Sequence, residues 1–201
     1  MKNLILALGV TALLSGNAFA ADELIVNGSF EAPALANGTW SNYDSITGWT
    51  GIDHGIEVRN NVEGSTPFGV NFVELDTSQN SGMYQNVATS YGQKYTLSFD
   101  FSDRPRVALD SQGLDVYWGV SKVGHVDNAS GWTQFTVSDL VGAAGSTKLS
   151  FYATGTSDGL GTSLDNVSLT AAVPEPETYG MMLAGLGLLG LVARRKGANK
   201  A

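Results

Sequence analysis

The side chains of this sequence that could take part in chemistry are mainly carboxylates, nineteen Asp and Glu against eleven Lys and Arg. Glu74 and Asp76 lie two residues apart in a strand-like segment and so share a face, and Asp100 and Asp103 are close along the chain. Such a pair could supply the acid and the nucleophile of a glycoside hydrolase. With this many acids, however, close pairs are expected whatever the protein does.

Motifs of other enzyme classes do not occur in the sequence. The only histidines, His54 and His125, are far apart and belong to no zinc-binding or triad-like pattern. No G-x-S-x-G, P-loop or H-E-x-x-H sequence is present. We therefore expect a protein that is not an enzyme, and a carbohydrate-active hydrolase stays open as the less favoured alternative.

Asp165 has the most informative position among the acids. It lies in the closing segment 164–169, where strand alternation places it on the same face as Val167 and Leu169. If that face is the core face, the carboxylate must be protonated, ion-paired or metal-bound, because burying an unpaired ion is costly. Basic residues are few, so a calcium ion held by carboxylates and backbone carbonyls is one solution. The alternative is that Asp165 caps a turn or accepts backbone N–H bonds.

Aromatic side chains are the second kind of candidate, because their apolar faces stack on sugar rings. Trp40 and Tyr43 lie in a stretch rich in Gly, Asn and Ser, and Tyr117 alternates with Trp118, so one of that pair faces away from the core. Trp132 and Phe135 would likewise point to opposite faces of a strand. Trp40, Tyr43, Tyr117 and Trp132 are therefore candidate glycan contacts, and the alternative for each is ordinary core or edge packing.

Strands must position these side chains, because apolar residues recur with period two almost throughout the middle of the chain. Clusters of Gly, Asn, Asp and Ser separate the apolar segments at regular intervals. The pattern predicts an all-β fold, a jelly-roll β-sandwich. The expected strands cover residues 24–27, 55–59, 71–76, 82–87, 95–101, 114–120, 132–137, 148–153 and 164–170.

Composition excludes several classes of function. The net charge is −8, which repels nucleic acid and anionic membranes, and there is no cluster of Lys and Arg in the middle of the chain for phosphates. The absence of cysteine excludes disulfides and thiol chemistry. Divalent cations and neutral sugars are more suitable partners than nucleic acid.

The N-terminal segment has the parts of a secretory signal peptide. Lys2 precedes an apolar run over residues 4–14, and Ala18 and Ala20 form an A-x-A cleavage site. We expect a signal peptide at residues 1–20, cut after Ala20. The ectodomain then covers residues 21–172, a usual size for one domain.

The C-terminal segment, residues 173–201, combines three features in a fixed order. Pro174, Glu175 and Pro176 come first, an uncharged run over residues 179–193 follows, and a cluster of Arg and Lys closes it at 194–196. As a helix, that run covers roughly 22 Å, less than the ~30 Å hydrocarbon core of a bilayer. The segment therefore predicts a short transmembrane helix whose cationic end stays in the cytoplasm.

These three features resemble the PEP-CTERM sorting signal of Gram-negative bacteria. The resemblance implies recognition by an exosortase at Pro174, Glu175 and Pro176 and a transient anchor in the inner membrane. It further implies transfer of the ectodomain to the cell surface or to an extracellular polysaccharide matrix. An ordinary C-terminal membrane anchor is the alternative.

A second resemblance covers nearly all of residues 23–170. The opening segment 27–31, the pair Gly48 and Trp49, the strand 92–99 and the closing segment 164–169 are similar to galactose-binding-like jelly rolls. Within that set they resemble the choice-of-anchor domains attached to PEP-CTERM tails and, more distantly, xylan- and glucan-binding modules.

This second resemblance implies both a metal site and a function. A structural calcium ion of the carbohydrate-binding relatives would be held here by the Ser29 carbonyl, Glu31, Glu57 and Asp165. The implied function is that of a surface protein that binds extracellular polysaccharide or is embedded in it. A purely structural matrix or adhesion protein without a defined sugar site is the open alternative.

Overall fold

The computed structural model describes residues 22–172, together with Met181, residues 184–187 and Leu189 near the C-terminus. The predicted signal peptide, with its cleavage site at Ala18 and Ala20, lies outside the described residues, as do Pro174, Glu175 and Pro176. Most of the predicted transmembrane helix also lies outside them. Among the residues that are described, no helix is long and apolar enough to cross a membrane.

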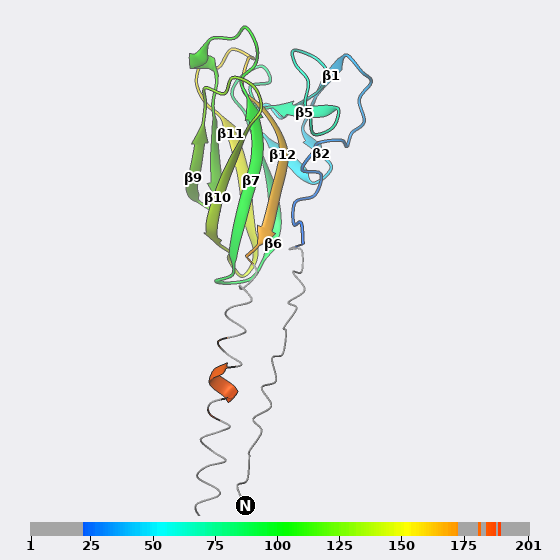
Figure 1. The fold of residues 1–201 in the computed structure, drawn as a ribbon. Coiled ribbons are helices and arrows are strands. Elements are labelled where there is room, and N and C mark those ends of the chain that lie inside the picture. Colours follow the sequence, from blue (N-terminus) through cyan, green and yellow to red (C-terminus); the bar gives the residue numbers. More distant parts are fainter. Residues whose placement is uncertain (1–21, 173–180, 182–183, 188, 190–201) are drawn as a thin grey trace, which may run out of the picture. The chain divides into compact units, whose positions relative to one another are not determined.

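The ectodomain, Ala21–Ala172, is one compact unit made of two antiparallel six-stranded sheets (Figure 1). The first sheet contains, in spatial order, β1 (Thr39–Tyr43), β4 (Ile56–Asn60), β5 (Asn71–Glu74), β12 (Ser163–Ala171), β7 (Lys94–Ser102) and β10 (Thr133–Val141). The second contains β2 (Ser45–Ile46), β3 (Trp49–Ile52), β6 (Gly82–Thr89), β11 (Gly145–Ala153), β8 (Leu114–Trp118) and β9 (Ser121–Val126). The predicted all-β sandwich is confirmed.

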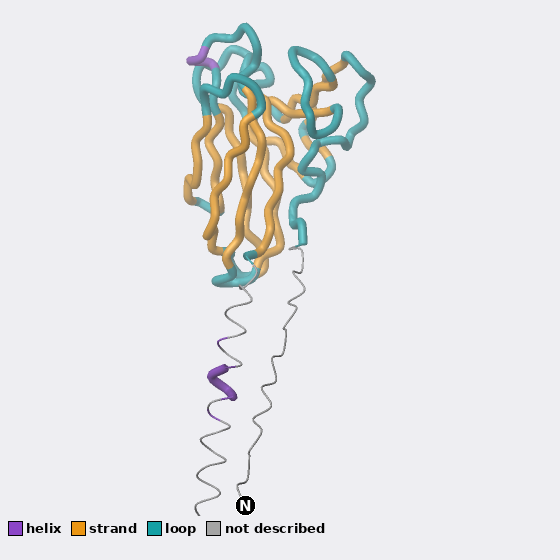
Figure 2. The backbone as a smooth tube through the Cα atoms, viewed as in Figure 1, coloured by secondary structure: helices purple, strands orange, loops and turns teal. Residues whose placement is uncertain are grey.

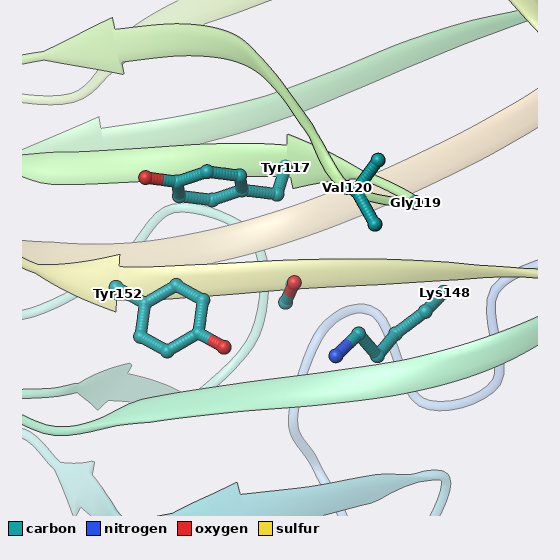
Figure 3. A pocket seen from close by; sticks show the side chains of 6 residues that line it. Tyr117, Gly119, Val120, Lys148 and Tyr152 are labelled. Atoms are coloured by element: carbon teal, nitrogen blue, oxygen red, sulfur yellow. The ribbon is translucent and has the colours of Figure 1, made fainter.

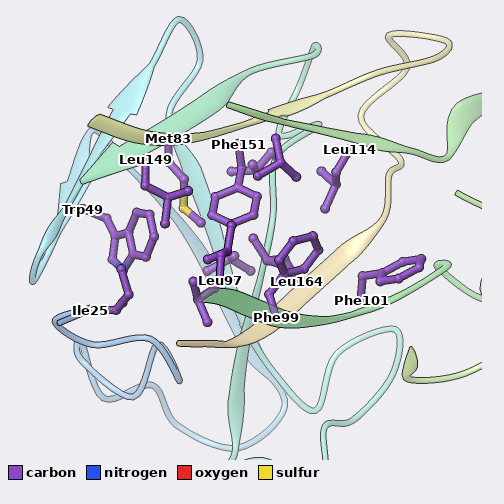
Figure 4. Close-up of a cluster of buried hydrophobic side chains, with 14 of the residues drawn as sticks. Ile25, Trp49, Met83, Leu97, Phe99, Phe101, Leu114, Leu149, Phe151 and Leu164 are labelled. Carbon is purple, nitrogen blue, oxygen red and sulfur yellow. The ribbon is translucent and has the colours of Figure 1, made fainter. Parts of the chain in front are cut away.

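The two sheets enclose one hydrophobic core, which explains the period-two pattern of the strands. Phe99 of β7 meets Phe151 of β11 edge to face, with ring centroids 5.1 Å apart (Figure 4). Trp49 of β3 lies within 6.0 Å of Phe151 and within 5.7 Å of Phe30, between ring centroids. The opening segment is therefore fixed to the sandwich through Phe30, which is fully buried.

Loops are distributed unevenly over the sandwich (Figure 2). Longer loops gather at the end that carries the short 3-10 helix Leu109–Ser111, whereas the opposite end is closed by tighter turns. The loop over residues 61–70 connects β4 to β5 and folds onto the outer face of the first sheet. Trp132 holds it there, because its indole N–H donates to the Ser65 carbonyl at 2.7 Å.

The predicted strand over residues 24–27 is wrong. Glu23 forms a single bridge with Thr170, and the Leu24 N–H donates to the Leu169 carbonyl at 3.0 Å, but no strand follows. Asn27 has a φ of 56°, which ends any extended run. Its side-chain amide instead closes a turn by donating to the Ala32 carbonyl at 2.7 Å.

The predicted orientation of Asp165 is also wrong, because β12 contains a β-bulge. Leu164 pairs with the inward-facing Phe101, so Asp165 pairs with Asp100 on the outer face of the first sheet. The register shifts between Asp165 and Ser168, where Asn166 has a φ of 50°, and this returns Leu169 to the core. Asp165 is nevertheless fully buried, because the loop 61–70 covers it.

Candidate functional site

Three half-buried tyrosines on neighbouring strands form an outward-facing aromatic surface of the described ectodomain. Tyr84 of β6, Tyr117 of β8 and Tyr152 of β11 alternate with buried neighbours and point away from the core. Ser150 pairs with Tyr84 on one side and with Tyr117 on the other, which sets the spacing between these two rings. We call this surface, on the outer face of the second sheet, the tyrosine face.

A shallow hollow of about 360 Å³ lies on the tyrosine face (Figure 3). The rings of Tyr117 and Tyr152 meet there edge to face, with centroids 5.6 Å apart. The Lys148 ammonium lies 5.6 Å from the centroid of the Tyr84 ring. The residues that line the hollow are Tyr117, Gly119, Val120, Lys148, Ser150 and Tyr152. A sugar ring could lie against the tyrosines while its hydroxyls contact the polar atoms beside them.

A local ion cluster borders the hollow. The Asp115 carboxylate lies 2.6 Å from Lys122 Nζ and 2.6 Å from His125 Nδ1. Burial alone would raise the pKa of Asp115, but the hydrogen bonds from Lys122 and His125, together with their charges, lower it below its usual value. Asp115 therefore stays ionised and forms an ion pair with Lys122.

The other aromatic candidates do not join the tyrosine face. Trp40 is 55% exposed but lies on edge strand β1 of the first sheet. Tyr43, on the same strand, is partly buried against the core, so the two do not form one platform. Trp132 packs edge-on against Phe68 and Phe72, with ring centroids 6.0 and 5.9 Å apart, and acts as a packing residue for the loop 61–70.

The predicted metal ligands separate into two groups. Glu31 and Asp165 are close enough for the charge of Glu31 to affect the titration of Asp165, and Ser29 lies two residues before Glu31. Glu57 is instead in a buried ion pair, 2.5 Å from Arg59 Nε. Arg59 also contacts Glu74 at 2.6 Å, so Glu57 belongs to an ionic network with these two side chains.

Asp165 is a buried carboxyl group that forms no ion pair with a basic side chain of the described ectodomain. Its carboxylate accepts hydrogen bonds from Thr66 Oγ1 at 2.5 Å and from the Asn166 N–H at 2.6 Å. Desolvation, aided by the charges of Glu31 and Asp100, raises the pKa of Asp165 to about 7 against the hydrogen bonds from Thr66 and Asn166. A hard cation beside Asp165 would favour its ionised form.

The residues around Asp165 fit a calcium ion only with help from the backbone. Among the described residues, no group of three or more His, Asp or Glu side chains is placed to hold a metal ion. Glu31 Oε1 accepts from the N–H groups of Val70 and Asn71 at 2.8 and 3.0 Å, which fixes its carboxylate at the start of β5. Calcium takes six to eight oxygens, so two carboxylates would need carbonyls such as that of Ser29.

The carboxylate pair suggested by spacing is buried. Glu74 and Asp76 are both 0% exposed. Desolvation raises the pKa of Glu74 to about 7, although Arg59 and Arg104 lower it. Asp76 accepts from the N–H groups of Asp158 and Leu160 at 3.1 and 3.3 Å and so fixes a loop. Neither carboxylate is placed where a substrate reaches it.

The C-terminal segment and the ectodomain are each similar to known sequences. Residues 172–196 match the family described as the PEP-CTERM protein-sorting motif, which confirms that resemblance. The chain is 33% identical over 154 residues to the multifunctional-autoprocessing repeats-in-toxin protein of Vibrio cholerae serotype O1, covering 75% of this chain. The protein of the same name from Vibrio vulnificus is 35% identical over 153 residues, 73% of this chain. The chain spans 3% of the length of each of these toxins.

Solved structures with the same fold include carbohydrate-binding modules and enzymes that carry them. A family 61 module in complex with β-1,4-galactotriose is similar at a TM-score of 0.51 and 17% identity, over 76% of this chain and 100% of that one. The CBM22-1–GH10 modules of Clostridium thermocellum xylanase 10B, complexed with xylohexaose, give a TM-score of 0.50 at 15% identity, over 77% and 29%. At these identities the likeness is one of fold.

The chain thus combines a sandwich of the kind found in carbohydrate-binding modules with a PEP-CTERM sorting segment. That segment marks the chain as exported and sorted to the cell surface.

Proposed function

We propose that this chain is a non-enzymatic surface or matrix protein whose tyrosine face binds extracellular polysaccharide. The observation that carries the proposal is the open hollow beside Tyr117 and Tyr152, where two half-buried rings border polar side chains. The fold shared with carbohydrate-binding modules supports the same conclusion. The partners in this proposal are an exosortase, the inner membrane during sorting and, afterwards, a polysaccharide of a Gram-negative cell surface or matrix.

The double substitution Tyr117→Ala and Tyr152→Ala tests the tyrosine face. Truncating two central aromatic contacts removes a large share of the binding energy, so we expect retention on the producer's own polysaccharide to fall at least about tenfold. Affinity electrophoresis measures this loss, and circular dichroism checks that the sandwich is intact. Trp40→Ala, an exposed aromatic on the other sheet, is the matched control and should bind normally. Equal loss in both variants, or in neither, contradicts the assignment of the site.

Removal of the C-terminal segment is a second expectation. Proline favours extended backbone at and before its own position, and the uncharged run that follows Pro174 and Pro176 in the sequence is short for a stable membrane anchor, which suits cleavage at that point. We expect mature surface protein to lack the helix and the Pro174→Ala, Pro176→Ala variant to retain it. Mass spectrometry of the surface fraction that detects peptides of residues 183–195 in most wild-type molecules would show that the segment stays as an anchor.

We also propose that Glu31 and Asp165, with the Ser29 carbonyl, bind a structural calcium ion. The support is the buried carboxylate of Asp165, which has no cationic partner among the described residues and lies near a second carboxylate. The ion would fix the opening segment and the loop 61–70 to β12. Its role would be structural and separate from the tyrosine face.

A further inference from the structure

Lys148 differs from every other Lys and Arg of the described ectodomain because it forms no salt bridge. The remaining five are each within 4.0 Å of a carboxylate: Arg59, Lys94, Arg104, Arg106 and Lys122. In a chain with an excess of acids, an unpaired lysine is unexpected. Its position on the protein therefore needs an explanation.

The position of Lys148 is the edge of the hollow on the tyrosine face. It precedes Ser150 by two residues on β11, so both side chains lie on the outer face, and it lines the hollow together with Tyr117 and Tyr152 (Figure 3). Its ammonium is held near the negative face of the Tyr84 ring, 5.6 Å from the centroid. This contact places the charge without using up its three hydrogen-bond donors.

Asp115, the one acid in the strands of the second sheet, does not neutralise Lys148. Asp115 is already bound by Lys122 and His125, each at 2.6 Å. The hollow therefore presents two half-buried aromatic rings and one available cation, whereas Ser150 between them is only 1% exposed. A neutral sugar would use only the rings, whereas the cation suits a negatively charged group carried by the sugar.

We propose that the tyrosine face takes anionic polysaccharide, with Lys148 binding an acidic group of the sugar while Tyr117 and Tyr152 contact its ring. This inference rests on the proposed function and adds the substrate class. The acidic group is a carboxylate or a sulfate ester, which share the oxygen acceptors that an ammonium binds. Since the rest of the domain is acidic, binding depends on this local charge rather than on long-range attraction.

The test uses matched polymers and the full-length exported chain. Polygalacturonate, alginate and β-1,4-glucuronan are each compared with their carboxyl-reduced forms, and a sulfated galactan is compared with its desulfated form. We expect the wild type to bind at least one acidic polymer about tenfold or more tightly than its neutral counterpart. Lys148→Gln should abolish this preference and leave the weaker neutral binding. Lys94→Gln, which removes an exposed lysine paired with Asp139 on the first sheet, should keep it.

The outcomes separate this inference from the proposed function. Equal binding of acidic and neutral forms by the wild type overturns the inference and leaves polysaccharide binding in place. An acidic preference that survives Lys148→Gln overturns the role of Lys148. Failure of the wild type to bind any of these polymers or the producer's own polysaccharide overturns both. The pair of polymers that responds tells whether the acidic group is a carboxylate or a sulfate.

Discussion

Arg59→Met is expected to lower the free energy of unfolding by about 3–5 kcal/mol, since it removes one partner of a buried ionic network. Arg59 is 1% exposed and contacts Glu57 at 2.5 Å and Glu74 at 2.6 Å. Methionine keeps most of the apolar stem but leaves two buried carboxylates. Arg104 lies 3.3 Å from Glu74 and compensates only in part.

Urea unfolding measures this change, and its pH dependence identifies the cause. Desolvation raises the pKa of Glu74 to about 7 even with Arg59 and Arg104 opposing it. An acid whose pKa is raised in the folded state destabilises the fold as pH rises through that pKa, so the defect of Arg59→Met should be larger at pH 8 than at pH 5.

The matched control for Arg59 is Arg106→Met. Arg106 pairs with Glu63 at 2.7 Å, but its side chain is largely exposed, so the unfolding curve should not move. If Arg59→Met unfolds at the wild-type urea concentration at both pH values, the carboxylates around it are already neutral, and the network does not stabilise the fold as an ionic one.

Strands with strict alternation could be predicted from the sequence, whereas short edge strands could not. The segments that became β7 and β8 alternate large apolar residues with polar ones, because one side of each faces the core. β1, β2, β3 and β9 were not predicted. β1 and β9 are edge strands with mostly exposed or half-buried residues, which leaves no periodic apolar signal.

The side of the sheet on which Asp165 lies could not be predicted, because it depends on one backbone angle, the φ of Asn166. Residues 164–169 appear as an unbroken alternation, which hides the bulge at Asn166. Asparagine adopts positive φ more readily than most residues, so Asn166 was a permissive position but not a diagnostic one. Asp165 is buried, as it would have been on a core face, but the covering group is the loop 61–70 rather than the opposite sheet.

The tyrosine face could be predicted only in part from the sequence. Alternation with Trp118 predicted that Tyr117 could face outward, and Trp118 indeed lies in the core. Tyr84 was missed although it follows the buried Met83 in an expected strand, a signal of the same kind. Lys148 could not be singled out, because its distinguishing property is the lack of an ion pair, which depends on the positions of all the other charges.

Removal of calcium from the wild type is expected to lower its melting temperature at pH 8 and to have little effect at pH 5. At a hundredfold excess over its dissociation constant, a bound ion stabilises the fold by about 2.7 kcal/mol. At pH 5 the raised pKa of Asp165, about 7, keeps this carboxyl protonated, and a protonated acid is a poor ligand. Magnesium should substitute poorly because it requires a tighter octahedral shell.

The raised pKa of Asp165 also predicts how the stability of the calcium-free protein depends on pH. The pKa of Asp165 is raised above its unfolded value, so its contribution to stability is present at low pH and is lost between about pH 4 and 7. The loss is about 4 kcal/mol at most, because each pKa unit corresponds to about 1.4 kcal/mol. Calcium reverses this trend by stabilising the ionised form.

Asp165→Asn and Glu31→Gln test the ligands separately. Both should abolish the response to EGTA, but only Asp165→Asn should also remove its share of the pH dependence, since the amide does not titrate. Asp139→Asn, an exposed aspartate paired with Lys94, is the control and should keep both responses. A wild type that ignores EGTA yet loses stability with rising pH would leave Asp165 as a buried acid without a metal. If it responds to neither, the hydrogen bonds from Thr66 and Asn166 are sufficient for the ionised carboxylate.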